Sequence, residues 1–457
     1  MVLGAGVAGL VTARVLSGHY DEVVVVERDE LPDRPDHRRF VPQSRHAHGL
    51  LGSGRRVLVG LFPGLSAELA EAGALTPGSG DPEMGDRSIF LVRGGTTIRI
   101  PAWWSGGFGA SRILLEHAIR ERVRALPNVV VRDRALAVGL LTDRTRRRVT
   151  GIRTADDDLG ADLVVDASGR GSRLPEWLER IGYRPPPVSV VHSDVRYVSV
   201  VTEPDPSFDP EWLVILGGGG ESASPVGGVV LRVEHGRLHI SFGSVGRSEP
   251  VPTGLPELRA FADRLTAPVV AEALRRSTPV GPIRTFRVRS NTRRHYDRMR
   301  EMPAGVLALG DAACAANPIY GQGMSVAALS AAALGRVLTA EGGAPRPGFE
   351  RRAARAMAAT SADAWRLAVG EDLRHGCLAE GVRSPWTARF GEGYRNRLER
   401  AAALDPEVAA AYNEVLNLHR PVSSLGSPRI ARRVLRPLRD RDPGTLSATV
   451  AAVLGVA

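Results

Sequence analysis

The chain has 457 residues, of which 43% are hydrophobic and 24% charged, so it can bury a large core and form about two or three subdomains. Its formal net charge is +10, and every basic residue is arginine. Because the arginines are spread along the sequence rather than gathered in a stripe, no nucleic-acid partner is expected.

Cysteine content and hydropathy argue against a disulfide-stabilised, a metal-binding and a membrane-spanning protein. The two cysteines, Cys314 and Cys377, are too few for a disulfide framework, which favours the reducing cytoplasm. No spacing of His, Cys, Asp or Glu indicates a metal site. The sequence has no uninterrupted run of about 18 apolar residues, so no transmembrane segment is expected.

The first predicted element is a short apolar strand that leads into a glycine-rich turn and an apolar helix. Gly4 allows a tight turn, Gly6 lets the backbone approach a pyrophosphate, and Gly9 lets the helix pack closely on the strand. The N-terminus of the helix, at Val7 and Ala8, presents N–H groups and a partial positive charge to phosphate. The spacing therefore predicts a dinucleotide site.

The second predicted strand, residues 22–26, ends at an acidic residue. Glu27 stands about twenty residues after the glycines, where a carboxylate accepts hydrogen bonds from ribose hydroxyls. The loop over residues 29–43 is rich in Pro, Asp and Arg, so we expect it near a cofactor rather than in the core.

Residues 86–109 alternate polar and apolar side chains and end in Trp103 and Trp104, which predicts two antiparallel strands. A helix is predicted over residues 110–127. We interpret the two tryptophans as the edge of a core, with the lining of a substrate entrance as the alternative.

Between residues 183 and 285 strand pairs predominate. Residues 228–233 and 238–242 flank Glu234-His235-Gly236, which is typical of a hairpin turn. The glycine run at residues 217–220 precedes no helix, so it is interpreted as a hairpin tip rather than a second nucleotide loop. Seven apolar residues of these strands are interpreted as packed core, with a substrate channel as the alternative. They are Val198, Val200, Leu213, Ile215, Val230, Leu231 and Ile240.

A second motif lies far downstream of the first. A buried strand is predicted to end at Gly310-Asp311, and Pro318 precedes a helix predicted over residues 325–338. Asp311 can accept hydrogen bonds from the ribityl hydroxyls of a flavin, and the dipole of the helix favours a reduced flavin ring. Together the motifs predict FAD, held at its adenylate and flavin ends. Asp311→Ala is expected to weaken FAD binding more than Glu27→Ala, because the ribose end is taken to be more solvated.

These two segments resemble the para-hydroxybenzoate-hydroxylase-like family of FAD monooxygenases. Residues 111–116 are similar to a family helix whose arginine, here Arg112, reaches FAD. Residues 162–173 resemble the family's central Asp-Gly segment, in which Ser168 replaces the aspartate and Gly169 is retained. In the family that segment helps to bind both FAD and NAD(P)H. With Ser168 in place of the aspartate, direct reduction of the flavin by a nicotinamide is one of two open alternatives.

A finer resemblance is to bacterial FAD epoxidases of polyether biosynthesis, which are relatives of squalene epoxidase. It rests on residues 40–49 and 317–324. The first segment contains Arg45, His46 and His48, and the resemblance places it beside the flavin; a surface position of the two histidines is the alternative. The resemblance is strong in the FAD segments and weak in the middle region, where the substrate is chosen.

The fold class is therefore expected to be α/β (α+β overall), with a Rossmann-like FAD-binding domain, an inserted antiparallel-sheet substrate domain and a helical C-terminal region. The FAD-binding domain is predicted over residues 1–85, 110–182 and 286–345, the sheet domain over 86–109 and 183–285, and the helical region over 346–457. The predicted cofactor-binding residues are Gly4, Gly6, Val7, Ala8, Gly9, Glu27, Arg28, Arg45, His46, His48, Arg112, Leu136, Ser168, Gly169, Gly310, Asp311, Pro318, Gly321, Gly323 and Met324.

The resemblance implies an FAD-dependent monooxygenase that epoxidises or hydroxylates a small apolar natural-product intermediate, a polyketide or terpenoid, through a flavin C4a-hydroperoxide. It implies dioxygen as co-substrate and NAD(P)H or a partner flavin reductase as electron donor, while no protein residue is assigned a catalytic role. The alternatives are an oxygen-independent flavin reductase of prenyl double bonds, similar to geranylgeranyl reductases, and a flavin-free escort protein of the same fold. Because flavin halogenases rely on an active-site lysine and this chain has none, halogenation is not expected.

Overall fold

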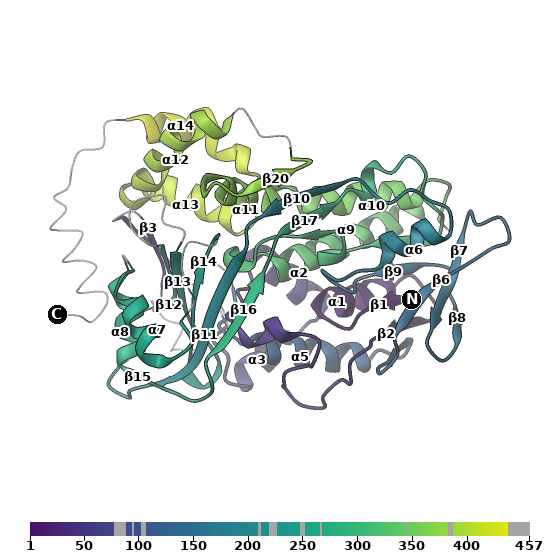
Figure 1. Cartoon of the computed structure of the whole chain (residues 1–457), viewed down its shortest axis with the longest axis horizontal. Coiled ribbons are helices and arrows are strands. Elements are labelled where there is room, and N and C mark those ends of the chain that lie inside the picture. Colours follow the sequence, from purple (N-terminus) through teal and green to yellow (C-terminus); the bar gives the residue numbers. More distant parts are fainter. Residues whose placement is uncertain are drawn as a thin grey trace.

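The central sheet of the computed structural model contains five parallel strands that lie far apart in the sequence (Figure 1). Their order across the sheet is β18, β9, β1, β2 and β5. Their bounds are β1 (Val2–Leu3), β2 (Val23–Val26), β5 (Val129–Arg132), β9 (Val164–Asp166) and β18 (Val306–Ala308). The structure describes residues 1–76, 88–93, 96–101, 107–208, 212–218, 226–246, 252–265, 267–342, 345–382 and 387–436.

Side chains of these strands point alternately into two cores, because both faces of the sheet are covered. Val2, Val25 and Val165 enter the core formed with the helices on one face. Those helices include α1 (Val7–Leu16), α2 (Gly52–Leu61), α3 (Leu65–Glu71), α5 (Arg112–Arg124), α9 (Gly323–Glu341) and α10 (Phe349–Thr360). Leu3 and Val26 enter the core on the other face. That core includes α6 (Leu174–Arg180) and the antiparallel strands β6 (Ala137–Thr142), β7 (Val149–Thr154) and β8 (Asp158–Gly160).

The helix predicted over residues 325–338 is confirmed as α9, which begins earlier, at Gly323. An 18-residue window of α9 has a mean hydropathy of 1.4, which is apolar enough for a membrane span by length and composition. In the fold α9 packs against α1, α2 and α10, and 56% of that window is buried. A core helix has the same composition, so the composition of α9 is weak evidence for a membrane segment.

A larger, mostly antiparallel sheet lies beside the central sheet, with the strand order β15, β11, β14, β13, β12, β3 and β4, and β16 paired with β11 (Figure 1). Its strands are β3 (Ser88–Arg93), β4 (Thr96–Pro101), β11 (Val195–Pro204), β12 (Trp212–Gly218), β13 (Val226–Arg232), β14 (Leu238–Ser244), β15 (Ser277–Pro279) and β16 (Arg284–Val288). The predicted strand pair over residues 86–109 is confirmed as β3 and β4. Trp103 and Trp104 lie outside the described residues.

The predicted hairpin around Glu234-His235-Gly236 is also confirmed, because β13 and β14 pair on either side of this turn. His235 has a φ of 60°, the left-handed conformation that a tight turn requires. The hairpin interpretation of the glycine run is supported as well, since β12 and β13 pair across it. Gly219 and Gly220 themselves lie outside the described residues.

One face of the larger sheet packs on two helices, α7 (Leu255–Ala262) and α8 (Pro268–Arg275). Val198, Val200, Val230 and Ile240 lie in this core, so their interpretation as packed core is confirmed. Leu231 points to the opposite face and is half-buried. Leu213 and Ile215 lie in β12, but their side chains are outside the described part of the structure.

The C-terminal region is helical, as predicted, with α10 followed by α11 (Ala362–Arg374), α12 (Thr387–Leu404), α13 (Pro406–Leu416) and α14 (Pro428–Leu435). The sequence missed one strand there, β20 (Leu378–Glu380), which pairs with β10 (Val188–His192). That strand belongs to a small sheet with β17 (Asn291–Arg294) and β19 (Cys314–Ala315). The helices α12 to α14 pack on β3 and β4, at the end of the molecule away from the central sheet (Figure 1).

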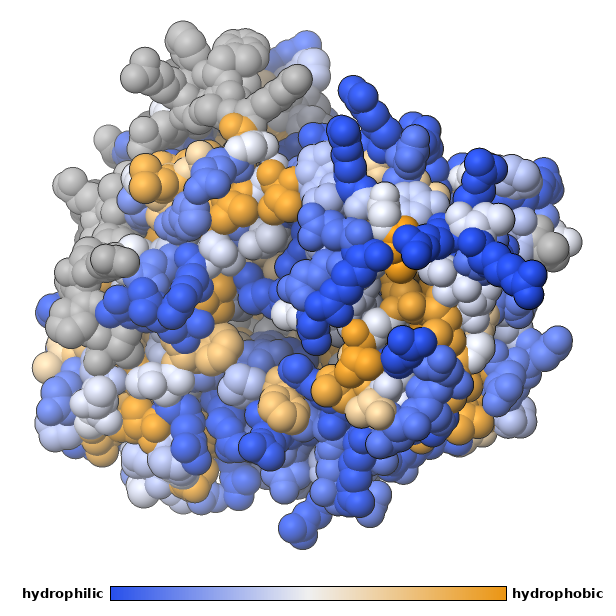
Figure 2. All heavy atoms as spheres, turned by 45° about the vertical axis from the view of Figure 1, so that its right-hand side comes forward, coloured by the Kyte–Doolittle hydropathy of each residue, from blue (hydrophilic) through white to orange (hydrophobic). Residues whose placement is uncertain are grey.

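Hydrophilic residues cover much of the face shown in Figure 2 and surround smaller hydrophobic areas. This distribution agrees with arginines that are spread along the whole sequence. The predicted domain boundaries stay a prediction.

Candidate functional site

The first glycine motif has the backbone geometry that a nucleotide-binding turn requires. Gly4 has a φ of 98°, and a Cβ there would lie 2.8 Å from the carbonyl oxygen of Ala167. A Cβ on Gly9 would lie only 1.7 Å from the carbonyl oxygen of Gly4, so the helix packs on the turn as predicted. Gly6 precedes α1 without any side-chain cap, and the nearest atom to its missing side chain, from Arg38, is 3.8 Å away. The start of α1, at Val7 and Ala8, therefore offers a helix N-terminus without a side-chain cap, with the Arg38 guanidinium in van der Waals range of Gly6.

The second motif lies directly against the first. Gly310 begins a short 3₁₀ turn after β18 and has a φ of 61°. A Cβ on Gly310 would lie 3.0 Å from the Cβ of Ala8, which is the second residue of α1. The predicted convergence of the two motifs is therefore confirmed, and Asp311, half-buried, follows at the point of contact.

A third segment joins this junction from the loop before α2. A Cβ on Gly321 would lie 3.6 Å from the Cα of Gly49, and Gly321 has a φ of 63°. The N–H of Leu51 donates to Ser325 Oγ at 2.9 Å. Residues 49–51 thus lie on the turn that contains the exposed Pro318 and on the start of α9, which comprises the exposed Gly323 and the buried Met324.

His46 and His48 are not surface residues, so that alternative is wrong. His46 is 5% exposed, its Nδ1 lies 2.8 Å from Ser199 Oγ, and its ring lies 5.5 Å from the rings of Tyr197 and Phe286. His48 Nδ1 donates to the His46 carbonyl at 2.8 Å, and its Nε2 accepts from the Arg112 guanidinium at 3.2 Å. The tautomer follows because a guanidinium can only donate.

Burial keeps these imidazoles neutral. Loss of hydration lowers the pKa of His46 to about 4, and it lowers the pKa of His48 well below the ordinary value, with the Arg112 charge acting in the same direction. His239, on β14, donates from Nε2 to the Arg45 carbonyl at 3.3 Å, and burial lowers its pKa to about 4. The segment from Arg45 to His48 is therefore tied to the larger sheet by uncharged hydrogen bonds.

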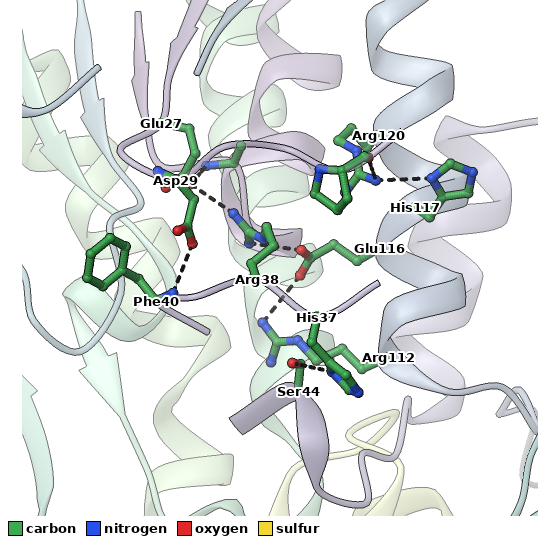
Figure 3. A network of polar contacts seen from close by, with 12 residues as sticks. Glu27, Asp29, His37, Arg38, Phe40, Ser44, Arg112, Glu116, His117 and Arg120 are labelled. Carbon is green, nitrogen blue, oxygen red and sulfur yellow. Dashed lines mark hydrogen bonds and ion pairs between the residues drawn. The ribbon is translucent and has the colours of Figure 1, made fainter. Parts of the chain in front are cut away.

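A buried network of charges surrounds Arg38 (Figure 3). Glu27 Oε2 accepts from the N–H of Ala5 at 2.7 Å and from the Arg38 guanidinium at 3.1 Å. The other side of Arg38 contacts Glu116 Oε1 at 2.8 Å, and Glu116 Oε2 lies 3.4 Å from Arg112. The network therefore links the glycine turn to the helix α5.

Two sequence expectations about this region need correction. The loop over residues 29–43 is partly in the core, because Asp29 and Arg38 are 3% and 4% exposed. Glu27 is 6% exposed, and its carboxylate accepts a hydrogen bond from the N–H of Ala5 in the glycine turn. The expectation that Glu27 lies at a solvated, ribose-binding end of the site is therefore wrong. Sequence reasoning also missed Arg38 and Glu116 as site residues. Glu116 could have been found from its spacing to Arg112, which is that of an i, i+4 ion pair on a helix.

Ser168, which stands where the resembling family has aspartate, turns back toward the protein. Its N–H and Oγ donate to Asp166 Oδ1 at 2.9 and 2.5 Å, and Ser172 Oγ donates to Asp166 Oδ2. Asp166 is fully buried, and this burial raises its pKa. Gly169 follows with a φ of 85°. The Cα of Ser168 lies 3.1 Å from a Cβ placed on Gly4, so the segment supports the glycine turn.

The remaining predicted residues lie near the end of β2. Arg28 is exposed, and its guanidinium lies 4.5 Å from the centre of the Phe40 ring. Leu136 is 47% exposed and follows Ala135, whose N–H donates to the Glu27 carbonyl at 2.8 Å.

A small hollow lies between the loop before α2 and the start of α5. It is lined by Asp36, Arg38, Val41, Ser44, Arg112, Ile113 and Glu116. Within the described residues, no group of three or more His, Cys, Asp or Glu side chains is placed to hold a metal ion.

The comparison with curated proteins shows the family of this chain. No protein-family model matches it. Protein Rv3254 of Mycobacterium tuberculosis (strain ATCC 25618 / H37Rv) is 33% identical over an alignment of 456 residues, which covers 96% of this chain and 94% of that protein. The chain therefore belongs to the family of Protein Rv3254.

Solved structures of flavin enzymes share the fold. The p-nitrophenol 4-monooxygenase PnpA from Pseudomonas putida superposes with a TM-score of 0.63 at 19% identity, over 92% of this chain and 98% of PnpA. PqsL, a probable FAD-dependent monooxygenase from Pseudomonas aeruginosa, superposes with a TM-score of 0.57 at 19% identity, over 88% of this chain and 98% of PqsL. These likenesses confirm the predicted α/β class and show that the chain has the fold of these two proteins.

Removal of Arg38 is expected to destabilise the fold strongly. Arg38→Met leaves the carboxylates of Glu27 and Glu116 buried without their shared cation, which costs about 3–5 kcal/mol of unfolding free energy. Urea unfolding followed by circular dichroism measures the loss. The matched control is Arg134→Met, which removes a solvent-exposed ion pair with Glu30 and should change stability little. Similar losses in the two variants would contradict the assigned role of Arg38.

Acidification is expected to destabilise the fold through its buried histidines. The pKa of His239 is lowered to about 4 in the folded chain, against about 6.5 for an unfolded histidine. Between these values the unfolded chain binds a proton that the folded chain does not, so stability falls as the pH falls. At about pH 5 this single group lowers the unfolding free energy by about 2 kcal/mol.

The variant His239→Gln isolates this contribution. It should lose about 2 kcal/mol less than the parent chain between about pH 7 and about pH 5. His19→Gln, at an exposed histidine, is the control for the substitution itself. An unchanged pH dependence in His239→Gln would show that folding does not shift the pKa of this imidazole.

Proposed function

We propose that the chain binds FAD across the junction of its two glycine motifs and acts as an FAD-dependent monooxygenase. The observation that carries the proposal is the contact between Gly310 and Ala8, which brings an acid-bearing turn to the N-terminus of α1. Two further features fit the cofactor. The first turn of α1 has no side-chain cap, and Gly6 has no side chain that would keep a pyrophosphate from the backbone.

The predicted residues then have distinct tasks. The amides at Gly6, Val7 and Ala8 would hold the pyrophosphate, while Gly4 and Gly9 shape the turn. Asp311 would accept hydrogen bonds from the ribityl chain. The remaining cofactor-binding set is proposed unchanged: Glu27, Arg28, Arg45, His46, His48, Arg112, Leu136, Ser168, Gly169, Gly310, Pro318, Gly321, Gly323 and Met324.

Bound FAD would supply the redox chemistry, namely reduction by NAD(P)H or a partner flavin reductase and oxygen transfer from dioxygen. The chain's own residues would position the cofactor and exclude water. The N-terminus of α9 would face the flavin end, where its dipole would favour negative charge. The neutral His46 and His48 add no competing positive charge at this junction.

We propose an uncharged organic substrate, specifically a natural-product intermediate that is epoxidised or hydroxylated. The support is the cluster formed by His46, Tyr197 and Phe286, in which the Tyr197 and Phe286 rings stack with centroids 6.1 Å apart. PqsL, which shares the fold, has been crystallised with 2-aminobenzoylacetate; this ligand supports a small organic substrate, but as a carboxylate it does not support the absence of charge. An aromatic cluster with a neutral imidazole suits an apolar or conjugated group rather than a charged one.

Asp311→Ala is expected to weaken FAD binding by about 10- to 100-fold, because a ribityl hydroxyl would lose its acceptor. Titration of the apoprotein with FAD, followed by quenching of flavin fluorescence, measures the dissociation constant. Asp156→Ala, at an exposed acid, is the control and should bind FAD like the parent chain. Equal affinities of the two variants would show that Asp311 does not contact the cofactor.

The reaction is tested with isotopically labelled dioxygen. FAD-loaded protein is photoreduced without air and mixed with a panel of uncharged alkenes and aromatic compounds, with labelled dioxygen or with none. The proposal expects product that carries one labelled oxygen atom, and no product without dioxygen. Saturated product formed in the absence of oxygen would instead identify a flavin reductase. Failure of the chain to take up FAD would indicate a flavin-free escort protein and overturn the proposal.

A further inference from the structure

A fully buried carboxylate from the C-terminal region contacts the turn that precedes α9. Asp372 lies on α11, beside β10, and is 0% exposed. Its Oδ1 accepts from the side-chain amide of Asn317 at 2.9 Å, and its Oδ2 accepts from the side-chain amide of Asn291 on β17. Within the described part of the chain no cation pairs with Asp372, and burial raises its pKa to about 6.

Asn317 connects Asp372 to the turn at residues 318–321, which precedes α9 at the proposed flavin end of the site. Its Oδ1 accepts from the N–H of Ile319 at 3.0 Å and thereby caps the short helix Pro318–Tyr320. Gly321 follows, where the chain contacts Gly49, and α9 begins two residues later. Asn317 is 2% exposed, so water does not offer an alternative partner.

The carboxylate decides which way the Asn317 amide faces. An ionised carboxylate can only accept hydrogen bonds, so the NH₂ group of Asn317 must face Asp372 and its oxygen must face Ile319. The reverse orientation would oppose two oxygens at Asp372 and two donors at Ile319. Asn291 satisfies the second carboxylate oxygen in the same way, so the buried charge is held by two amide groups from separate segments.

We propose that Asp372 is a positioning residue for the flavin end of the cofactor site: it orients Asn317, and through Asn317 it sets the turn from which α9 starts. The inference rests on the proposed function, since it concerns the environment of bound FAD. It assigns the C-terminal helical region a task at the cofactor, although α11 lies outside the predicted FAD-binding segments.

An exchange of the side chains at positions 317 and 372 tests the proposal. Asn317→Asp places two carboxylates face to face, whereas Asp372→Asn can satisfy both of its amide partners if the Asn291 amide, whose oxygen has no partner among the described residues, turns over. In the double variant Asn317→Asp/Asp372→Asn, the new amide can donate to position 317 and accept from Asn291, while position 317 still caps Ile319. The hydrogen-bond pattern and the single negative charge are both restored.

Three readouts follow from this design: the FAD dissociation constant, the visible circular dichroism of bound flavin, and the thermal midpoint. Asn317→Asp should bind FAD about tenfold more weakly and change the flavin spectrum, Asp372→Asn should lose less because the Asn291 amide can turn over, and the double variant should return to within about threefold of the parent. Asp363→Asn is the matched control on the same helix, because that carboxylate pairs with the exposed Arg366. It should leave the affinity and the spectrum unchanged.

Each outcome has a defined meaning. Parental affinity and spectrum in Asn317→Asp, or a double variant whose losses are the sum of the single losses, would overturn the positioning role. A parent chain that takes up no FAD would overturn the proposed function instead. If a single variant does not fold, Asn317→Ser serves in its place, because it keeps a capping oxygen but removes the amide that Asp372 orients. An unchanged flavin spectrum in Asn317→Ser would also overturn the inference.

Discussion

The close approach of Gly310 to Ala8 is the constraint on which the candidate site depends. It exists because β18 and β1 are both neighbours of β9, so the turns that follow them emerge on the same edge of the sheet. A side chain at position 310 would force the two turns apart, and the left-handed backbone there favours glycine in any case. Everything proposed about a shared cofactor follows from this one contact.

Around this contact the interior contains several charged side chains and imidazoles that contact one another. Arg38 neutralises Glu27 and Glu116 together, and Arg112 continues the network to His48. Beyond Arg112 the hydrogen-bonding groups are uncharged, because burial keeps the imidazoles of His48 and His239 neutral where this segment contacts the larger sheet. Charges thus surround the glycine turn, where phosphate is proposed to bind, and neutral groups face the region proposed for the substrate.

Much of the fold followed from local patterns. The alternation in residues 86–109, the hairpin turn at residues 234–236 and the apolar start of the second motif each specify their own backbone geometry, and all three are confirmed. The strand β20 was missed because its three residues form a strand only through pairing with β10. Arg38 and Asp372 were missed for a similar reason, since each becomes significant through partners far away in the sequence.

By itself the sequence determined the glycine positions, the strand and helix periods and the residue types that a flavin-binding turn requires, because these are set by short-range sterics and spacing. Only the tertiary structure decided that His46 is buried and that both His46 and His48 are neutral, that Glu27 holds the glycine turn, and that Ser168 turns toward Asp166. Burial, and with it pKa and hydrogen-bond choice, depends on which distant segments come together. That information resides in strand pairing and packing, which no single stretch of the chain contains.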